Sequence, residues 1–251
     1  MRPNLLILGG TSEASTLARR VAQMDVDAKL SYAGRVANPL AQPIPVRSGG
    51  FGGVKGLAAY MQDHGVTHLV DATHPFAAQI STNACMASRA ADVRMCALQR
   101  APWVAGAGDD WTHVTDMQSA AQTLGNPPKN VFLGIGRQDV TIFTLAPHHR
   151  YLLRVVDPPD AAFPLPNYDV IVARGPFDLA GDLDLLAGHK IDIVVSKNAG
   201  GTGARAKIDA ARALGLPVVM IDRPTMPPRR EVSSVDAEID WLSHSGTERG
   251  V

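Results

Sequence analysis

The sequence has few aromatic side chains, few cysteines and no excess of charge. Phenylalanine, tryptophan and tyrosine make up 5% of its 251 residues, so we expect a core built from aliphatic side chains and alanine. Lysine plus arginine and aspartate plus glutamate number 24 each, which argues against a protein that binds nucleic acid through general positive charge. An anionic ligand would have to be met by local clusters of arginine and lysine.

The cysteines and the hydrophobic runs exclude further classes. Cys85 and Cys96 have no metal-ligand spacing and no accompanying histidine motif, so the sequence predicts no metal site and two buried thiols in a reducing cytosol. No apolar run is long enough to span a bilayer. The chain enters a strand-like run within a few residues, so no signal peptide is expected. We therefore expect a cytoplasmic protein without membrane or nucleic-acid partners.

The complete dinucleotide fingerprint G-x-G-x-x-G is also missing, but a related pattern opens the chain. Leu5–Leu8 is an unbroken aliphatic run, Gly9 and Gly10 follow, and the apolar stripe of a helix begins near Ser12. A strand, a glycine turn and a helix aim backbone N–H groups at a phosphate. Thr11 replaces the second glycine and can cap the helix. The pattern favours a nucleotide phosphate site, with an ordinary tight turn as the alternative.

The second strand-like run, residues 28–32, ends without an acidic residue. Enzymes that use NAD usually place aspartate or glutamate there to bind the adenosine ribose. This chain has Ser31, with Arg35 close behind. A hydroxyl and a guanidinium suit a 2′-phosphate, so the sequence favours NADP over NAD, with a surface arginine as the alternative.

Two later stretches carry further candidate ligand residues. In the glycine-rich stretch 47–53, we expect Arg47, Ser48 and the backbone of the following glycines to approach a cofactor. A strand then ends near Asp71, and Thr73 and His74 follow it. Because open α/β sheets bind ligands at the carboxyl ends of their strands, these side chains are candidates for contacting the nicotinamide or the substrate.

The second half of the chain repeats the alternation of strands and helices. Strands are expected near residues 113–114, 131–136, 151–156, 169–173, 191–195 and 216–221. Two α/β domains follow from this pattern: residues 1–104 and residues 105–251, joined within the connection 101–111. We expect two Rossmann-like domains, each a mostly parallel sheet flanked by helices, with the active site in the cleft between them.

Basic residues fall at or near the strands of the second half, mostly at carboxyl ends. They are Arg137, Arg154, Arg174 and Lys197. A glycine-rich helix entrance that contains Gly200, Gly201 and Thr202 follows Lys197, and it suits a carboxylate or phosphate. This collection predicts a cleft that binds a polyanion, with solvated surface charge as the alternative.

Five motifs in order make the chain similar to the precorrin-6A reductase family. They lie at residues 6–14, 49–53, 71–77, 173–177 and 196–201. The resemblance implies an NADPH-dependent oxidoreductase of cobalamin biosynthesis that reduces precorrin-6A to precorrin-6B. In that reaction hydride goes to C19 and a proton to C18 of the macrocycle. The substrate would be a polyanionic tetrapyrrole, and transient contact with other pathway enzymes is left open.

The residues and the resemblance together define three sets of candidate site residues. The catalytic candidates are His74, Lys197, Arg137 and Asp71. The cofactor-binding candidates are Gly9, Gly10, Thr11, Ser12, Glu13, Ser31, Arg35, Ser48, Gly49, Gly50 and Thr73. The substrate-binding candidates are Arg137, Arg154, Arg174, Lys197, Gly200, Gly201 and Thr202.

Several alternatives stay open from the sequence. The substrate could be the cobalt-bearing precorrin of the anaerobic branch of the same family. A protein that binds a nucleotide or tetrapyrrole without turnover would show the same first site. A transferase using a nucleotide-sugar or S-adenosylmethionine is disfavoured by the missing acidic residue near Ser31, because an unphosphorylated ribose needs such a partner there.

Overall fold

The computed structural model describes residues 2–33 and 41–244, which form two compact units. Unit 1 comprises residues 1–101 and 224–251, and unit 2 comprises residues 102–223. Within the described residues, each unit contains a six-stranded sheet in which the neighbouring strands run parallel. The predicted fold class, two Rossmann-like α/β domains, is confirmed, whereas the cleft between them stays a prediction.

The sheet of unit 1 has the strand order β12-β5-β4-β1-β2-β3. Its strands are β1 (Asn4–Leu8), β2 (Asp27–Tyr32), β3 (Val46–Ser48), β4 (His68–Asp71), β5 (Arg94–Leu98) and β12 (Glu231–Val232). Its helices are α1 (Ser12–Val21), α2 (Gly53–Asp63), α3 (Ala78–Ala90) and α7 (Val235–His244). The strand order reverses between β1 and β4, which is where doubly wound sheets bind their ligands.

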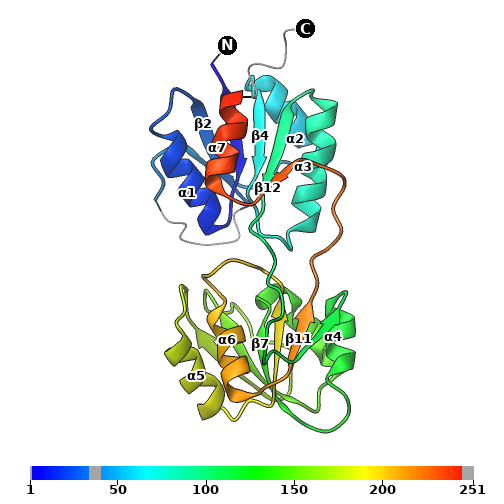
Figure 1. Cartoon of the computed structure of the whole chain (residues 1–251). Helices are drawn as coiled ribbons and strands as arrows, with labels where there is room; N and C mark the ends of the chain where they lie inside the picture. Colours follow the sequence, from blue (N-terminus) through cyan, green and yellow to red (C-terminus); the bar gives the residue numbers. More distant parts are fainter. Residues whose placement is uncertain (1, 34–40, 245–251) are drawn as a thin grey trace. The chain divides into compact units, whose positions relative to one another are not determined.

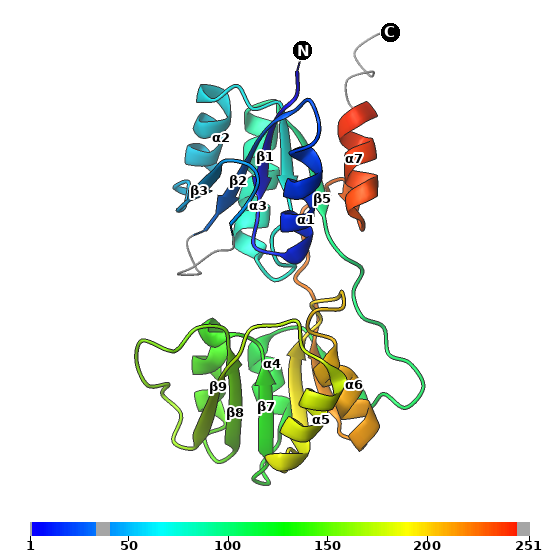
Figure 2. The ribbon, with the colours of Figure 1, turned by 90° about the vertical axis from the view of Figure 1, so that its left-hand side faces the viewer.

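Strand β1 shows why this sheet is covered on both faces. Leu5 and Ile7 belong to a buried cluster with α1 and α7, whereas Leu6 and Leu8 belong to a second cluster with α2 and α3. Successive side chains of a strand point to opposite faces, so an unbroken aliphatic run needs a helical layer on each side. Figures 1 and 2 show α1 and α7 together on one side of unit 1.

The sheet of unit 2 has the order β6-β11-β10-β7-β8-β9. Its strands are β6 (Trp111–Val114), β7 (Asn130–Gly134), β8 (Arg150–Val155), β9 (Tyr168–Val172), β10 (Ile193–Lys197) and β11 (Val218–Ile221). Its helices are α4 (Met117–Thr123), α5 (Leu179–Gly188), α6 (Ala206–Leu214) and a 3-10 helix, η1 (Arg137–Leu145). The order reverses between β7 and β10, so a second ligand-binding position is expected beyond their carboxyl ends.

The C-terminal part of the chain corrects the predicted domain boundary. The sequence assigned residues 105–251 to the second domain, but residues 224–251 return to unit 1. There β12 pairs with β5, with Glu231 opposite Ala97 and Val232 opposite Leu98, and α7 packs on α1. A two-residue strand leaves no periodic signal, and its partner lies more than 130 residues earlier, so the pattern of the sequence alone could not place it.

The starts of three helices are defined by the structure. The helix α3 begins at Ala78. The cap of α4 is Asp116, whose carboxylate accepts from the backbone N–H of Ser119. Likewise α5 begins after Asp178, which caps it.

Two expectations from composition can be compared with the fold. Cys85 and Cys96 are both buried and are not joined by a disulfide bond, as predicted. Among the described helices, none combines the length and the hydrophobicity that a membrane span requires.

The helix α7 carries one fully buried carboxyl group, on Glu238. Burial raises its pKa to about 7, against smaller opposing effects of the Cys96 thiol of β5 and the Arg230 guanidinium. On the same helix, Trp241 packs edge-on against His68 of β4, and burial lowers the pKa of that histidine. Docking of α7 therefore favours a protonated Glu238 and a neutral His68.

The substitution Glu238→Gln should stabilise the protein at high pH but not at low pH. The folded-state pKa of Glu238 is raised from 4.5 to about 7, so the native state favours its proton and this contribution is lost as the pH rises through about 7. The variant should match the parent below about pH 4.5 and exceed its free energy of unfolding by about 3 kcal/mol above pH 7. Chemical unfolding at several pH values measures the difference in the free energy of unfolding between variant and parent. The pH dependence that His68 contributes is the same in both proteins, so it cancels in this difference.

The matched control is Asp240→Asn, which neutralises an exposed carboxylate on the same helix. It should change the free energy of unfolding by less than about 0.5 kcal/mol at every pH. A difference between Glu238→Gln and the parent that does not vary with pH would contradict the burial argument.

Candidate active site

Thr11 closes the turn between β1 and α1. Its Oγ1 accepts a hydrogen bond from the backbone N–H of Ala14 at 3.1 Å and donates to the carbonyl of Ala72 at 2.8 Å. Because Ala72 directly follows β4, one hydroxyl joins the carboxyl ends of the two strands where the sheet order reverses. The prediction that Thr11 caps the helix is confirmed.

The two glycines beside Thr11 serve different purposes. A Cβ at Gly9 would lie 2.7 Å from a β2 side chain, so this glycine permits close packing of the turn on the sheet. Gly10 has φ +140° and no atom within 4 Å of the position of a Cβ, so its backbone borders open space. Ser12 donates to Glu13, whose carboxylate also pairs with Arg100 at 2.9 Å. Glu13 therefore helps to fix the start of α1.

The end of β2 is occupied by a serine and an arginine from neighbouring strands. Ser31 is buried and pairs in register with Arg47 of β3. The guanidinium of Arg47 donates to the Ser31 hydroxyl at 3.2 Å and to the carbonyls of Gly49 and Gly50 at 2.5 Å and 2.8 Å. It also lies 3.8 Å from the ring centroid of Phe51. A preorganised cation thus stands where doubly wound folds meet the adenosine ribose.

Two other members of the expected cofactor set differ from this pair. Ser48 ends β3 and is exposed. Arg35 lies outside the described residues. Among the described residues, Arg47 is the arginine that the structure brings to the end of β2, and the role of Arg35 stays a prediction.

Asp71 is fixed by its own ion pair. It is fully buried, its Oδ2 accepts from Arg229 at 2.8 Å, and the Arg229 side chain is 6% exposed. Its Oδ1 accepts from the backbone N–H and the hydroxyl of Thr73 at 3.1 Å and 2.6 Å. A carboxylate whose oxygens already accept from three donors has little capacity left to meet a ligand, so we reassign Asp71 from catalysis to the positioning of Thr73.

His74 lies in the loop after β4. Its Nδ1 accepts a hydrogen bond from the backbone N–H of Phe76 at 3.2 Å. The ring is partly buried, and the same loop contains Thr73. His74 therefore stays a candidate for contacting the nicotinamide or the substrate.

In unit 2, Lys197 and Arg137 stand after neighbouring strands. Lys197 ends β10, and its Nζ lies 2.6 Å from Asp139 Oδ2 of η1. Arg137 begins η1 after β7, is largely exposed, and contacts Asp160 at 3.5 Å. Because β7 and β10 are adjacent parallel strands, the structure brings both cations to the reversal point of this sheet.

The loop after β10, residues 198–203, is fixed by hydrogen bonds to a neighbouring segment of unit 2. Gly200 and Gly201 have φ +70° and +68°, which favour glycine and turn the chain sharply. The side chain of Asn198 bonds both the N–H and the carbonyl of Trp103, at 2.7 Å and 3.0 Å. Thr202 is exposed at the tip of the loop. The loop therefore presents a fixed glycine backbone, suited to an anionic group.

The structure pairs Arg154 inside unit 2, which argues against its expected role in substrate binding. Its guanidinium forms a two-pronged ion pair with Asp182 of α5 and lies 3.7 Å from the ring centroid of Phe177, and both charged side chains are buried. The positive charge of Arg154 is therefore neutralised inside unit 2, because this side chain of β8 packs against the helix α5. Arg174, by contrast, is half exposed and only loosely paired with Asp157 at 3.5 Å.

Sequence reasoning missed three residues that hold these loops. Arg229 pairs with Asp71, Trp103 pairs with the loop after β10, and Arg223 donates to the carbonyls of that loop. Each acts over a long sequence separation and belongs to no local motif, so no signal short of the fold could have found them. Within the described part of the chain, no group of three or more histidine, cysteine, aspartate or glutamate side chains is arranged for a metal ion.

Comparisons with known proteins give one consistent result. Residues 4–243 match the family model described as "Precorrin-6x reductase CbiJ/CobK". The chain is 53% identical over 248 residues to a precorrin-6A reductase of Rhodobacter capsulatus, covering 98% of this chain and 99% of that one. It is 45% identical over 244 residues to a precorrin-6A reductase of Sinorhizobium sp, covering 97% and 94%. A solved structure, "CobK precorrin-6A reductase", matches with a TM-score of 0.94 at 52% identity, covering 99% and 100%.

The substitution Arg154→Gln should destabilise the protein, because it leaves Asp182 buried without its cation. A loss of about 3–5 kcal/mol in the free energy of unfolding is expected, measured by chemical unfolding. Arg174→Gln is the matched control, since it removes an exposed arginine from the same unit, and it should cost less than about 1 kcal/mol. Equal stability of the two variants would restore Arg154 as a candidate for binding substrate.

Proposed function

Because this chain belongs to the precorrin-6x reductase family, we propose that it uses NADPH to reduce precorrin-6A to precorrin-6B. It is an oxidoreductase of cobalamin biosynthesis. The proposed reaction adds hydride to C19 and a proton to C18 of the macrocycle. The observation that carries the proposal is the pairing of Ser31 with Arg47 at the end of β2, where an enzyme specific for NAD would place a carboxylate.

The residues of unit 1 fit a dinucleotide phosphorylated on its ribose. The open backbone at Gly10, the start of α1 and the Thr11 turn suit the pyrophosphate. Arg47 is held by the carbonyls of Gly49 and Gly50, so little ordering is needed when it meets a 2′-phosphate. When bound, NADPH supplies the hydride, and the protein supplies orientation and electrostatic field.

The residues of unit 2 fit the acetate and propionate carboxylates of a tetrapyrrole. Arg137 and Arg174 are exposed, so they can form two-pronged hydrogen bonds with carboxylates. The backbone around Gly200 and Gly201 can receive a further carboxylate. We assign these four residues and Lys197 to substrate binding.

Two side chains are proposed to support the chemical step. Lys197 carries an ammonium beside Asp139, and it can donate a proton or stabilise negative charge that develops on the macrocycle. His74, in the loop after β4, can orient the nicotinamide or the substrate through a hydrogen bond. A guanidinium is a poor proton donor, so the role proposed for Arg137 is to stabilise negative charge.

The cobalt-bearing precorrin is the second candidate substrate. The metal-free compound is preferred because the relatives that are 53% and 45% identical are both named precorrin-6A reductases. A binding protein without turnover is the remaining alternative, and it predicts that the cofactor binds but is not oxidised.

The test is oxidation of NADPH by the purified protein with precorrin-6A, followed at the absorbance band of the reduced nicotinamide. We expect turnover with NADPH, and a kcat/KM at least roughly tenfold lower with NADH. Binding of NADPH without oxidation, with both precorrin-6A and its cobalt form, would reject the reductase. Equal use of the two cofactors would reject the 2′-phosphate site.

The substitution Arg47→Ala should weaken NADPH binding far more than NADH binding. Loss of a charge-assisted contact to the 2′-phosphate predicts roughly a tenfold or greater rise in the Kd of NADPH, measured by nicotinamide fluorescence. Lys55→Ala removes an exposed cation from the neighbouring α2 and should leave both Kd values unchanged. Equal losses for NADPH and NADH would assign Arg47 to loop packing alone.

A further inference from the structure

The chain passes from one unit to the other twice, and both passages make unusual contacts. The outgoing segment, residues 99–103, leads from β5 into unit 2. The return segment, residues 223–229, leads from β11 back to unit 1. Linkers between domains are usually exposed and make few contacts. Here each segment carries side chains that bond the ligand loops of the unit at either end.

In unit 1, the outgoing segment contacts both loops at the reversal point of the sheet. The Nε2 of Gln99 donates to the carbonyl of Thr73 at 3.2 Å, and Gln99 is 9% exposed. The next residue, Arg100, pairs with Glu13 at the start of α1 at 2.9 Å. The loop after β4 and the start of α1 are therefore both bonded to the segment that leaves the unit.

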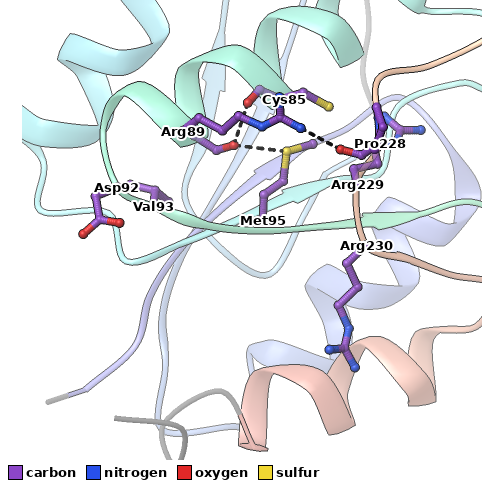
Figure 3. A pocket seen from close by; sticks show the side chains of 9 residues that line it. Cys85, Arg89, Asp92, Val93, Met95, Pro228, Arg229 and Arg230 are labelled. Carbon is purple, nitrogen blue, oxygen red and sulfur yellow. Dashed lines mark hydrogen bonds between the residues drawn. The ribbon is translucent and has the colours of Figure 1, made fainter.

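The return segment is connected to the same loop through Asp71 of β4. The ion pair of Arg229 with Asp71 directs two hydrogen bonds of Asp71 onto Thr73. Arg229 also donates from Nε to Glu231 at 2.8 Å, which fixes the plane of its guanidinium. Figure 3 shows Arg89 of α3 bonded to the carbonyl of Pro228, beside a cavity of about 310 Å³ under the segment. The guanidinium of Arg229 is thus oriented by Glu231 as well as by Asp71, and Arg89 holds the backbone of the preceding residue.

In unit 2, the two segments hold the loop after β10. From the outgoing segment, Trp103 bonds Asn198 through its backbone and donates from Nε1 to the carbonyl of Gly201 at 2.7 Å. From the return segment, Arg223 donates to the carbonyls of Asn198 and Ala199 at 3.0 Å and 3.1 Å. Three backbone carbonyls of this loop, those of Asn198, Ala199 and Gly201, therefore already accept hydrogen bonds from the two segments.

We propose that the outgoing and return segments are positioning elements of the enzyme, with Arg229 setting the cofactor loop and Arg223 setting the substrate loop. The proposal rests on the proposed function, because it takes the loop after β4 to meet NADPH and the loop after β10 to meet the tetrapyrrole. Both arginines act through other residues rather than on the reacting atoms. Arg223 donates to carbonyls of the loop after β10, whereas Arg229 pairs with Asp71 at the end of β4 and with Glu231 of β12.

A structural role and a positioning role give different kinetics. A structural defect would lower stability and affect both ligands, whereas a positioning defect should affect one ligand in each variant. Arg229→Gln should raise the Kd and KM of NADPH roughly tenfold with the KM of precorrin-6A unchanged. Arg223→Gln should raise the KM of precorrin-6A roughly tenfold with the Kd of NADPH unchanged.

The matched control is Arg212→Gln. Arg212 of α6 forms a two-pronged pair with the buried Asp109 at 2.8–2.9 Å and touches neither ligand loop in any contact described above. Its loss should lower the melting temperature without changing either ligand constant. Kd values for NADPH come from nicotinamide fluorescence and KM values from turnover.

Because Arg229→Gln leaves a buried carboxylate without its cation, the double variant Asp71→Asn with Arg229→Gln is measured beside it. The pair is then neutral, so the protein folds, while the ionic anchor of the loop is gone. We expect the same roughly tenfold rise in the Kd of NADPH. A Kd equal to that of the parent in the double variant, or losses for both ligands in every variant, would overturn the proposal. A parent protein that does not bind NADPH would instead overturn the proposed function.

Discussion

The constraint on which both units depend is the parallel direction of their strands. When all strands of a sheet run the same way, their carboxyl ends share one edge, and the loops that leave that edge meet where the strand order reverses. This brings the turn after β1 beside the loop after β4, and η1 beside the loop after β10. The site residues are therefore gathered by topology, although they are scattered in the sequence.

The arginines of this protein differ in how deeply they are buried and in which groups they already pair with. Arg154 and Arg229 are buried and paired with buried aspartates, and they stabilise or position the structure around them. Arg137 and Arg174 are exposed and weakly paired, which suits recognition of an outside carboxylate. Arg47 is intermediate, since neutral carbonyls and a ring orient it without neutralising its charge. Burial and partner, rather than position at a strand end, decide the role of each.

The return of the C-terminal segment to unit 1 makes this unit depend on residues that follow unit 2 in the chain. The edge strand β12 and the helix α7 belong to unit 1 but follow the whole of unit 2 in the sequence. Asp71 consequently depends on Arg229, a residue that follows all of unit 2 in the chain. Unit 1 is therefore incomplete if the chain is cut at the boundary that the sequence suggested.

The sequence by itself determined the fold class, most strand positions, the Thr11 cap and the family. These follow from short-range patterns, namely aliphatic runs, glycine turns and helix periodicity, which are readable within a few residues. The tertiary structure alone decided that Arg154 and Asp71 are committed to ion pairs, that Arg47 meets Ser31, and that residues 224–244 belong to unit 1. Such facts depend on contacts between residues far apart in the chain, because burial and pairing are properties of the assembled fold.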